Sequence, residues 1–575
     1  MKSVLSGNEA FARGAYEAAV KVVSSYPGTP STEITENLTK YDGLYVEWAT
    51  NEKVALEVAI GASMAGSRAL TAMKHVGLNV AADPLMTVSY TGINGGLVII
   101  VADDPNMYSS QNEQDSRHYT RFSKLPMLEP SNSAEARAYV LNAFHISEKY
   151  GCPVLVRSTT RVSHSLSAVE LGERAEAQPI EFKKEPLRWV MTPINARSRH
   201  KIVEERLTKL RELSDELTEE FISAKEIGII TSGVPFNYVM EAIPEASVLK
   251  LGMVWPLPLA KIKKFAGKVN RLYVVEELDT VIETELKAAG INITPLQREL
   301  CGELSVDKVM ELFGKKTPEI KPLTEPLPMR LPNMCAGCSH RGIFFAINRL
   351  RLTVTGDIGC YTLGYMPPLS AIDSCICMGA SVSMIHGFDK GSGGVKAKQA
   401  VGVVGDSTFL HTGISGLINT VYNQGLSTLI ILDNRITGMT GHQPNPVSGF
   451  NIRGIPVPKL DLEALCRAIG VKHVRKVDPF DPELCVQILK EETAREEVSV
   501  IITDRPCVFV DKAAIQAPYE INTNCSACKI CLRLGCPAIS WEAEKGKALI
   551  NTAQCSGCGL CRKVCRFEAI EQTSV

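Results

Sequence analysis

The sequence has few aromatic residues and almost no net charge. Phe, Trp and Tyr make up 6% of its 575 residues, and 62 basic residues balance 63 acidic ones to a net charge of −1. A chain without a basic excess lacks the long-range attraction on which nucleic-acid binding depends. The charge balance therefore argues against a nucleic acid as the partner.

Long apolar runs are also missing. The most apolar short run, residues 97–102, fits a buried strand and is far too short to span a bilayer. The first nine residues contain no apolar stretch of signal-peptide length. Eighteen cysteines in a chain without an export signal indicate metal centres in a reducing compartment rather than disulfides. We therefore expect a cytoplasmic protein without a membrane partner.

Eight of the cysteines gather in residues 520–575. They form two runs in which three cysteines at two-residue gaps are followed by a fourth: Cys525, Cys528, Cys531, Cys536 and then Cys555, Cys558, Cys561, Cys565. Such runs are typical of ferredoxin-type α+β domains with two [4Fe–4S] clusters, where the fourth cysteine of each run binds the other cluster. The spacing therefore predicts one cluster on Cys525, Cys528, Cys531 and Cys565, and a second on Cys536, Cys555, Cys558 and Cys561.

Zinc and disulfides are the alternatives for these runs. Zinc sites use two spaced pairs rather than two triplets, and disulfides need an oxidising compartment. The runs depart from the usual spacing in two places: the last gap of the first run is four residues long, and Arg566 stands where a proline is usual. The tail has few large apolar side chains, and a domain of that size needs inorganic cross-links. Clusters remain the better interpretation.

Strand and helix signals alternate along the rest of the chain, which is typical of α/β domains with parallel sheets. Residues 8–23 are expected to form a helix, and residues 196–221 an amphipathic helix exposed to solvent. The predicted organisation is an α/β domain at 1–165, a charged helical connector at 166–224, a smaller parallel-sheet domain at 225–315, a proline-rich linker, and a third α/β domain at 333–515.

A second chemical motif lies in the third α/β domain. Strand 400–404 leads into Gly405-Asp406-Ser407, and strand 429–432 leads into Asp433-Asn434. Neighbouring parallel strands end at the same sheet edge, where open α/β sheets bind ligands, and N–H groups at a helix start bind phosphate. The motif therefore predicts a diphosphate site.

Magnesium fits the same motif. One carboxylate with neutral oxygens satisfies Mg²⁺ when a diphosphate supplies further ligands. We expect side-chain ligation by Asp406 and Asn434, and ligation by the carbonyl of Ile436. The alternative is an ordinary strand–loop–helix unit in which Asp406 only caps the helix.

This element resembles the Gly-Asp-Gly…Asn-Asn element of thiamine-diphosphate enzymes, with Ser407 at the second Gly and Asp433 at the first Asn. Such enzymes need a carboxylate against the N1′ atom of the aminopyrimidine, which acts as a tuned general acid. Glu52, after Thr50 and Asn51, is the candidate in the first domain. Taken alone, Glu52 fits equally an acid that stabilises a helix N-terminus.

With the cysteine tail added, the whole chain resembles the 2-oxoacid:ferredoxin oxidoreductases. The resemblance is carried by residues 26–31 (Tyr-Pro-Gly-Thr-Pro-Ser), 51–57, 73–79, 109–115, 335–338 and 440–443, together with the motif at Gly405–Asn434 and the tail. It implies a pyrimidine-binding domain at 1–165, a transketolase-C-like domain at 225–315 and a diphosphate-binding domain at 333–515. It also implies that Thr29 lies near the reacting carbons and that His75 contacts substrate or cofactor. The alternative for His75 is a satisfied loop histidine.

The resemblance implies oxidative decarboxylation of an arylpyruvate such as indolepyruvate, with thiamine diphosphate and Mg²⁺ as cofactors. Electrons would leave through the clusters to ferredoxin, and coenzyme A would take the acyl group. A small gamma-type beta subunit and an α₂β₂ assembly are implied partners. Two alternatives are a relative specific for pyruvate or 2-oxoglutarate, with a basic residue in its pocket, and a non-catalytic electron-transfer subunit that needs neither Glu52 nor Asp406.

Four further cysteines leave two interpretations open. Cys335, Cys338, Cys360 and Cys507 resemble, in order and approximate spacing, the ligands of a cluster near the thiamine in pyruvate-type relatives. The alternative is that they are remnants of a turn and small buried hydrophobes. The cysteines without a pattern are interpreted as structural: Cys152, Cys301, Cys375, Cys377, Cys466 and Cys485.

Overall fold

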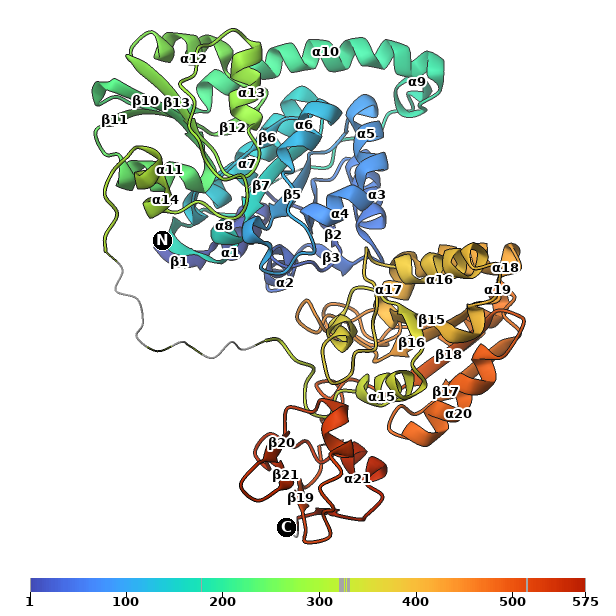
Figure 1. Ribbon diagram of the computed structural model, residues 1–575. Helices are drawn as coiled ribbons and strands as arrows, with labels where there is room; N and C mark the ends of the chain where they lie inside the picture. Colours follow the sequence, from blue (N-terminus) through green and yellow to red (C-terminus); the bar gives the residue numbers. More distant parts are fainter. Residues whose placement is uncertain are drawn as a thin grey trace. The chain divides into compact units, whose positions relative to one another are not determined.

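The computed structural model describes residues 2–176, 178–319, 325, 327, 331–512 and 515–573. The chain divides into two compact units, Met1–Thr324 and Glu325–Val575, coloured blue to green and yellow to red in Figure 1. Over the described residues, no helix combines the length and apolar character needed to cross a membrane.

A seven-stranded sheet, in the order β12-β6-β7-β5-β4-β2-β3, forms the centre of the first unit. Every residue of β4 (Ala69–Lys74), β5 (Leu97–Asp103) and β7 (Val154–Thr159) is buried, as expected for parallel strands covered on both faces. The remaining strands are β2 (Val22–Ser25), β3 (Tyr45–Trp48), β6 (Met127–Leu128) and β12 (Met253–Trp255). The helices beside it include α1 (Gly7–Glu17), α2 (Thr32–Leu38), α3 (Glu52–Met64), α4 (His75–Val80), α5 (Ala82–Thr91) and α7 (Ser133–Tyr150).

The helix predicted over residues 8–23 is wrong in its second half. A capping box at Ser6 and Glu9 starts α1, but the helix ends at Glu17. β2 begins at Val22 and pairs with β3 and β4. Consecutive β-branched residues pack well in a strand and lose side-chain freedom in a helix, so the valines favour the sheet.

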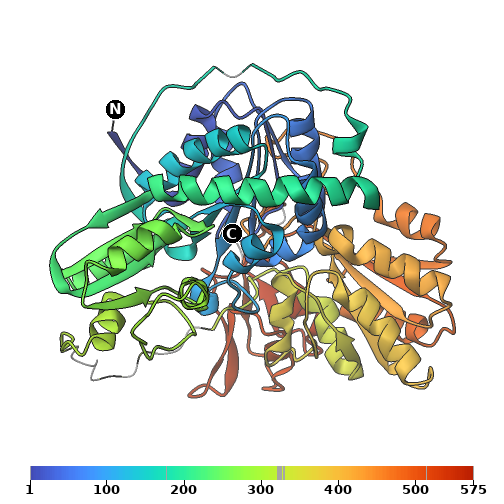
Figure 2. The ribbon, with the colours of Figure 1, turned by 90° about the horizontal axis from the view of Figure 1, so that it is seen from above.

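A second sheet, in the order β13-β10-β11-β9, completes the first unit. β10 (Ala224–Ser232) runs parallel to β11 (Ala246–Leu251) and β13 (Arg271–Val275), whereas β9 (Thr218–Phe221) is antiparallel. The long helix α10 (Pro193–Glu216) contacts α5 of the first sheet's layer and α12 (Leu259–Ala266) of the second, and Figure 2 shows it crossing this unit.

Parts of the connector at 166–224 pack on the first unit, although most of residues 170–201 are exposed. β8 (Leu166–Glu170) pairs with β1 (Lys2–Ser6), and β9 joins the second sheet. On α10, Leu207 and Leu210 are buried. Part of the apolar stripe of α10 therefore packs against the unit, while Ile202 is 42% exposed. A helix that carries such a stripe gains by burying it.

The second unit contains a parallel five-stranded sheet in the order β14-β15-β16-β18-β17. Its strands are β14 (Thr353–Thr355), β15 (Ala400–Gly405), β16 (Thr428–Asp433), β17 (His473–Val477) and β18 (Ser499–Asp504). Gly405 pairs with Leu432 in register, so β15 and β16 end at the same edge. The covering helices include α15 (Arg341–Leu350), α16 (Ala380–Gly391), α18 (Ile414–Tyr422), α19 (Leu462–Ile469) and α20 (Pro482–Thr493).

The cysteine tail packs on α15 of the same unit. It contains two small antiparallel pairs, β19 (Tyr519–Ile521) with β22 (Ile570–Gln572) and β20 (Ile539–Glu542) with β21 (Lys547–Ile550). A 3₁₀ turn, η6 (Ile530–Leu534), and a short helix, α21 (Leu560–Val564), complete it. Phe345 of α15 joins the few buried apolar side chains of the tail.

Candidate cluster and cofactor sites

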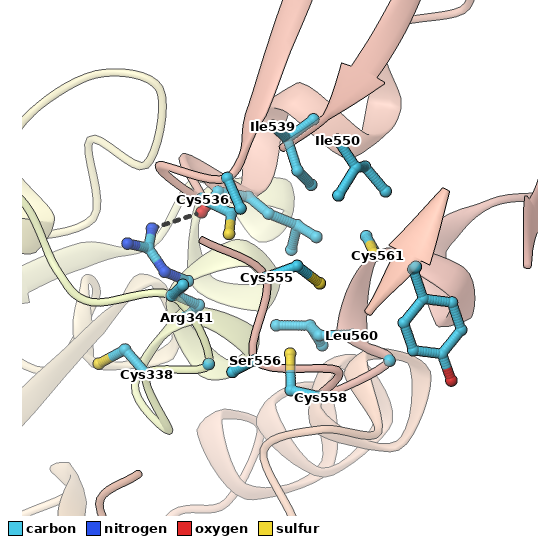
Figure 3. A pocket seen from close by; sticks show the side chains of 16 residues that line it. Cys338, Arg341, Cys536, Ile539, Ile550, Cys555, Ser556, Cys558, Leu560 and Cys561 are labelled. Carbon is cyan, nitrogen blue, oxygen red and sulfur yellow. Dashed lines mark hydrogen bonds between the residues drawn. The ribbon is translucent and has the colours of Figure 1, made fainter. Parts of the chain in front are cut away.

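One cavity, which Cys338 also lines, is surrounded by four cysteines of the tail (Figure 3). They are Cys536, Cys555, Cys558 and Cys561, the group predicted for the second cluster. Apolar side chains, including Leu534, Ile550 and Leu560, line the same cavity. The fourth cysteine of the first run has thus crossed over to the three of the second run.

A second cavity is lined by the other four: Cys525, Cys528, Cys531 and Cys565. Ile530, Trp541 and Ile570 line it as well. These four are the group predicted for the first cluster, again with three thiols from one run and one from the other.

The donor arrangement of the tail fits iron–sulfur clusters. The thiols of each group of four surround one cavity that also has an apolar lining. At Gly557, φ is +69°, and an added Cβ would clash with the carbonyl of Gln516, so only glycine fits this ligand loop.

The structure also gathers the four dispersed cysteines of the second unit. Cys335 and Cys338 precede α15, Cys360 opens a 3₁₀ helix, η2 (Cys360–Tyr365), and Cys507 follows β18. Burial, together with the thiols of Cys507 and Cys335, raises the pKa of Cys360 to about 11. Burial and the thiols of Cys360 and Cys335 raise the pKa of Cys338 to about 12. These effects place the Cys360 thiol within electrostatic range of the thiols of Cys335, Cys338 and Cys507.

Asp406 lies at the carboxyl end of β15 and is buried. Its carboxylate accepts hydrogen bonds from the backbone N–H groups of Ser407 at 2.5 Å and Arg435 at 2.7 Å. Burial, and next the neighbouring Asp433, raise the pKa of the Asp406 carboxyl well above its usual range. The buried Oδ1 atom of Asp433 has no hydrogen-bond partner among the described residues. Two facing carboxylates with an unsatisfied oxygen fit a divalent cation.

The other predicted ligands of this edge lie on the loop after β16. The Oδ1 atom of Asn434 accepts from the N–H of Ile436 at 3.3 Å. The Ser407 hydroxyl accepts from Thr437 at 2.9 Å. At Gly405, an added Cβ would lie 2.7 Å from the ring of Tyr361, so the strand end has no room for a side chain. Asn445, which the sequence reasoning missed, also contacts Asp406, at 3.4 Å.

In the first unit, Glu52 is the first residue of α3 and is 5% exposed. Asn51 caps that helix by accepting from the N–H of Val54 at 2.9 Å. At Gly77, an added Cβ would lie 2.5 Å from the Oε1 atom of Glu52, so the carboxylate lies directly against α4. The helix start thus holds this acid in a fixed place in the interior.

His75 begins α4 and is 1% exposed. Its Nε2 atom lies 3.3 Å from the carbonyl of Asn112, whereas Nδ1 is buried without a hydrogen-bond partner in the described part of the chain. Burial lowers the pKa of His75. The carbonyl of Thr29 accepts from the Ser109 hydroxyl at 3.0 Å.

Lys74 is a site residue that the sequence reasoning missed. It ends β4, and its ammonium donates to the carbonyl of Ser109 at 3.0 Å. Burial lowers its pKa to about 8, partly offset by Asp104 and Glu52. Its Cδ atom would lie 3.2 Å from a Cβ added at Gly28. A buried lysine therefore stands close to both Thr29 and Glu52.

Three family descriptions match the chain. Residues 13–225 match the thiamine-diphosphate-binding domain of pyruvate flavodoxin/ferredoxin oxidoreductases. Residues 357–503 match the C-terminal thiamine pyrophosphate-binding domain of thiamine pyrophosphate enzymes, and residues 548–571 match a 4Fe-4S binding domain.

Relatives match over the full length. Indolepyruvate oxidoreductase subunit IorA of Pyrococcus horikoshii is 41% identical, over 99% of this chain and 97% of its own. The IorA subunit of Methanothermobacter thermautotrophicus is 40% identical over the same shares. The 2-oxoglutarate synthase subunit KorA of that organism is 25% identical, over 52% of this chain and 94% of its own.

Proposed function

The chain belongs to the indolepyruvate oxidoreductase (IorA) family of 2-oxoacid:ferredoxin oxidoreductases, and we propose from this that it is the catalytic large subunit of an enzyme that oxidatively decarboxylates arylpyruvates. The products are the aryl-acetyl thioester of coenzyme A, carbon dioxide and reduced ferredoxin. Thiamine diphosphate and [4Fe–4S] clusters are its cofactors.

One observation carries the proposal. In the second unit, the sheet edge at Asp406 and Asn434 contacts the dispersed cysteines, and the dispersed cysteines contact the tail. The N–H of Cys507 donates to the carbonyl of Asn434 at 3.0 Å, which joins the dispersed cysteines to the diphosphate loop. On the other side, a Cβ at Gly337 would clash with the hydroxyl of Ser556, between two tail cysteines. A continuous electron path from the cofactor to the tail fits this order.

Each site residue then has a task. Asp406, Asn434 and the carbonyl of Ile436 hold Mg²⁺ and, through it, the diphosphate. Thiamine diphosphate, when bound, supplies the electron sink that decarboxylation requires. Glu52 holds a proton against the aminopyrimidine nitrogen.

The remaining polar groups of the first unit face the substrate. The Lys74 ammonium binds the carboxylate of the substrate. Thr29 and His75 contact the reacting groups of the substrate and cofactor. The dispersed cysteines would hold a third cluster, and the clusters, when bound, would supply one-electron transfer from the cofactor to ferredoxin.

Arylpyruvate is favoured over 2-oxoglutarate by the relatives. The IorA subunits match almost the whole chain at about two fifths identity, whereas KorA matches only 52% of it at 25% identity. The family also uses a gamma-type domain, which we assign to a separate small beta subunit. The assembly that we propose is α₂β₂.

The proposal is tested by anaerobic co-purification with the small subunit. Reduction of a viologen dye is then measured with indolepyruvate, pyruvate or 2-oxoglutarate, each with and without coenzyme A. We expect turnover that needs coenzyme A and is fastest with indolepyruvate. A preference for pyruvate or 2-oxoglutarate would replace the substrate assignment. No turnover with any 2-oxo acid, in protein that retains its iron, would leave an electron-transfer subunit.

A further inference from the structure

A buried arginine separates two of the cysteine sets. Arg341 is the first residue of α15, three residues after Cys338, and its side chain is 2% exposed. Figure 3 shows it between Cys338 and Cys536. The proposed function gives this side chain no role.

Every hydrogen-bond partner of Arg341 is neutral. Its guanidinium donates to the carbonyls of Cys335 at 3.1 Å, Leu534 at 2.9 Å and Gly535 at 2.6 Å. It also donates to the carbonyl of Met334 and, at 3.5 Å, to Asn333 Oδ1. The guanidinium thus forms hydrogen bonds both to the loop of Cys335 and Cys338 and to the loop that leads into Cys536.

Thiols of both cysteine sets lie near Arg341: Cys338, Cys536 and Cys558 line the same cavity as its side chain. Burial lowers its pKa, and the thiols of Cys338, Cys536, Cys335 and Cys558 act in the opposite direction. Two of these belong to the dispersed set and two to the second tail cluster. An arginine keeps its charge in a protein, and a buried charge without a counter-ion is costly. Among the described residues, the hydrogen-bond partners of this guanidinium are neutral oxygens, so loaded cysteine sets are the counter-charge we expect for it.

Loaded clusters would provide that counter-charge. A cluster held by four thiolates is anionic in both redox states and gains one further negative charge on reduction. Net charge and nearby dipoles set its reduction potential. A fixed cation between two clusters therefore favours the reduced form of each.

We propose that Arg341 is a positioning residue of the electron path, placed between the dispersed cluster and the second tail cluster to stabilise the reduced form of both. The proposal rests on the proposed function, which supplies the third cluster. In each transfer one electron moves: the dispersed cluster is oxidised and the Cys536–Cys561 cluster is reduced. No proton or further reactant is needed.

The test is a redox titration of the holoenzyme with mediators and dithionite, followed by EPR, which needs no substrate. R341M removes the charge and keeps much of the volume. Both neighbouring clusters should become harder to reduce, with the ratio of oxidised to reduced cluster rising about tenfold at a fixed potential, or about 59 mV for a one-electron couple. The Cys525–Cys565 cluster serves as an internal reference and should not shift.

A second variant protects the test against misfolding. Asn333 is exposed and already contacts the guanidinium, so N333D adds a counter-charge without removing a buried side chain. N333D should make the same two clusters harder to reduce, with a smaller change in reduction potential than in R341M. In R341K, which keeps the positive charge, the reduction potentials of both clusters should stay closer to the wild-type values. The matched control is R349M on the same helix, where Arg349 is partly exposed and paired with Glu483 at 2.6 Å.

Unchanged potentials in N333D and in iron-replete R341M would overturn the proposal, as would wild-type protein without a third cluster signal. These outcomes are distinct from failure of the proposed function. Wild-type turnover with unchanged potentials removes only the role of Arg341, whereas absence of turnover with any 2-oxo acid removes the function itself.

Discussion

The second unit contains cysteine sets of two kinds, which differ in how their members are brought together. The eight tail cysteines lie within residues 525–565, on short loops with few buried apolar neighbours. The four dispersed cysteines come from residues 335 to 507 and are placed by a parallel sheet with its own core. We expect the tail to depend on its clusters for folding. In the body, meaning the five-stranded sheet of the second unit and its helices, the fold places the four cysteines without help from a cluster.

The two regions should therefore differ in whether their folding depends on bound clusters. A small domain with little core depends on its metal centres to fold. A sheet that buries its strands on both faces does not, so it can place ligands and acids where the reaction needs them. Four changes test or sharpen this contrast.

The largest expected effect comes from the first unit, whose sheet also buries its strands on both faces. E52Q removes the proton-handling carboxylate, and kcat should fall by roughly 10²–10⁴-fold, the usual contribution of a general acid or base. Iron content should stay at the wild-type value, because Glu52 lies in the first unit. The exposed Glu57 on the same helix provides the control E57Q. Full activity in E52Q would contradict the assignment.

The tail should respond to loss of one ligand by loss of structure. In C561A we expect about four fewer irons per chain and rapid proteolysis of the tail, because the cluster replaces a core there. Iron analysis and limited proteolysis measure both. C485A, at a buried cysteine of α20, should leave both unchanged. A protease-resistant tail without that iron would show that the tail folds unaided.

The same change in the body should have a smaller structural effect. C360A should also lose about four irons, but the melting temperature of the body should stay close to wild type because its sheet and helices bury a separate core. Calorimetry and iron analysis on one sample compare the two variants. If iron content does not change in C360A, the dispersed set does not hold a cluster.

The smallest effect concerns Lys74. Its pKa of about 8 means that the ammonium loses its proton as the pH rises through 8. If this cation binds the substrate carboxylate, kcat/KM should fall in that range. K74M should be independent of pH there, with KM raised about tenfold, because hydrogen bonds to charged groups contribute about 1.5–3 kcal/mol. K74R should move the fall to higher pH. If kcat/KM still falls steeply as the pH rises through 8 in K74M, the titrating group is not Lys74.

The contrast also explains what the sequence could predict. The spacing of the tail cysteines predicts the same groups of four that line the two cavities, because their ligand loops are local; that they bind iron stays a prediction. Cys360 and Cys507 left two interpretations open, since only the sheet brings them to the loop of Cys335. The strand–helix alternation predicted the parallel sheets, including the shared edge of Gly405 and Asn434.

Other features had no local signal. The sequence did not single out Lys74 or Arg341, because burial and neighbours from distant segments give each its character. The stripe on α10 was predicted to face solvent, whereas Leu207 and Leu210 are buried, because pattern alone does not say what covers a helix. β12, from the segment predicted as a separate domain, pairs with β6 of the first sheet.

The most direct test of the account is the cofactor content of anaerobically purified protein. The account predicts about twelve irons, at four for each of three clusters, with equal sulfide and one thiamine diphosphate per chain. About eight irons with one thiamine would confine the clusters to the tail and contradict the electron path through Cys335, Cys338, Cys360 and Cys507.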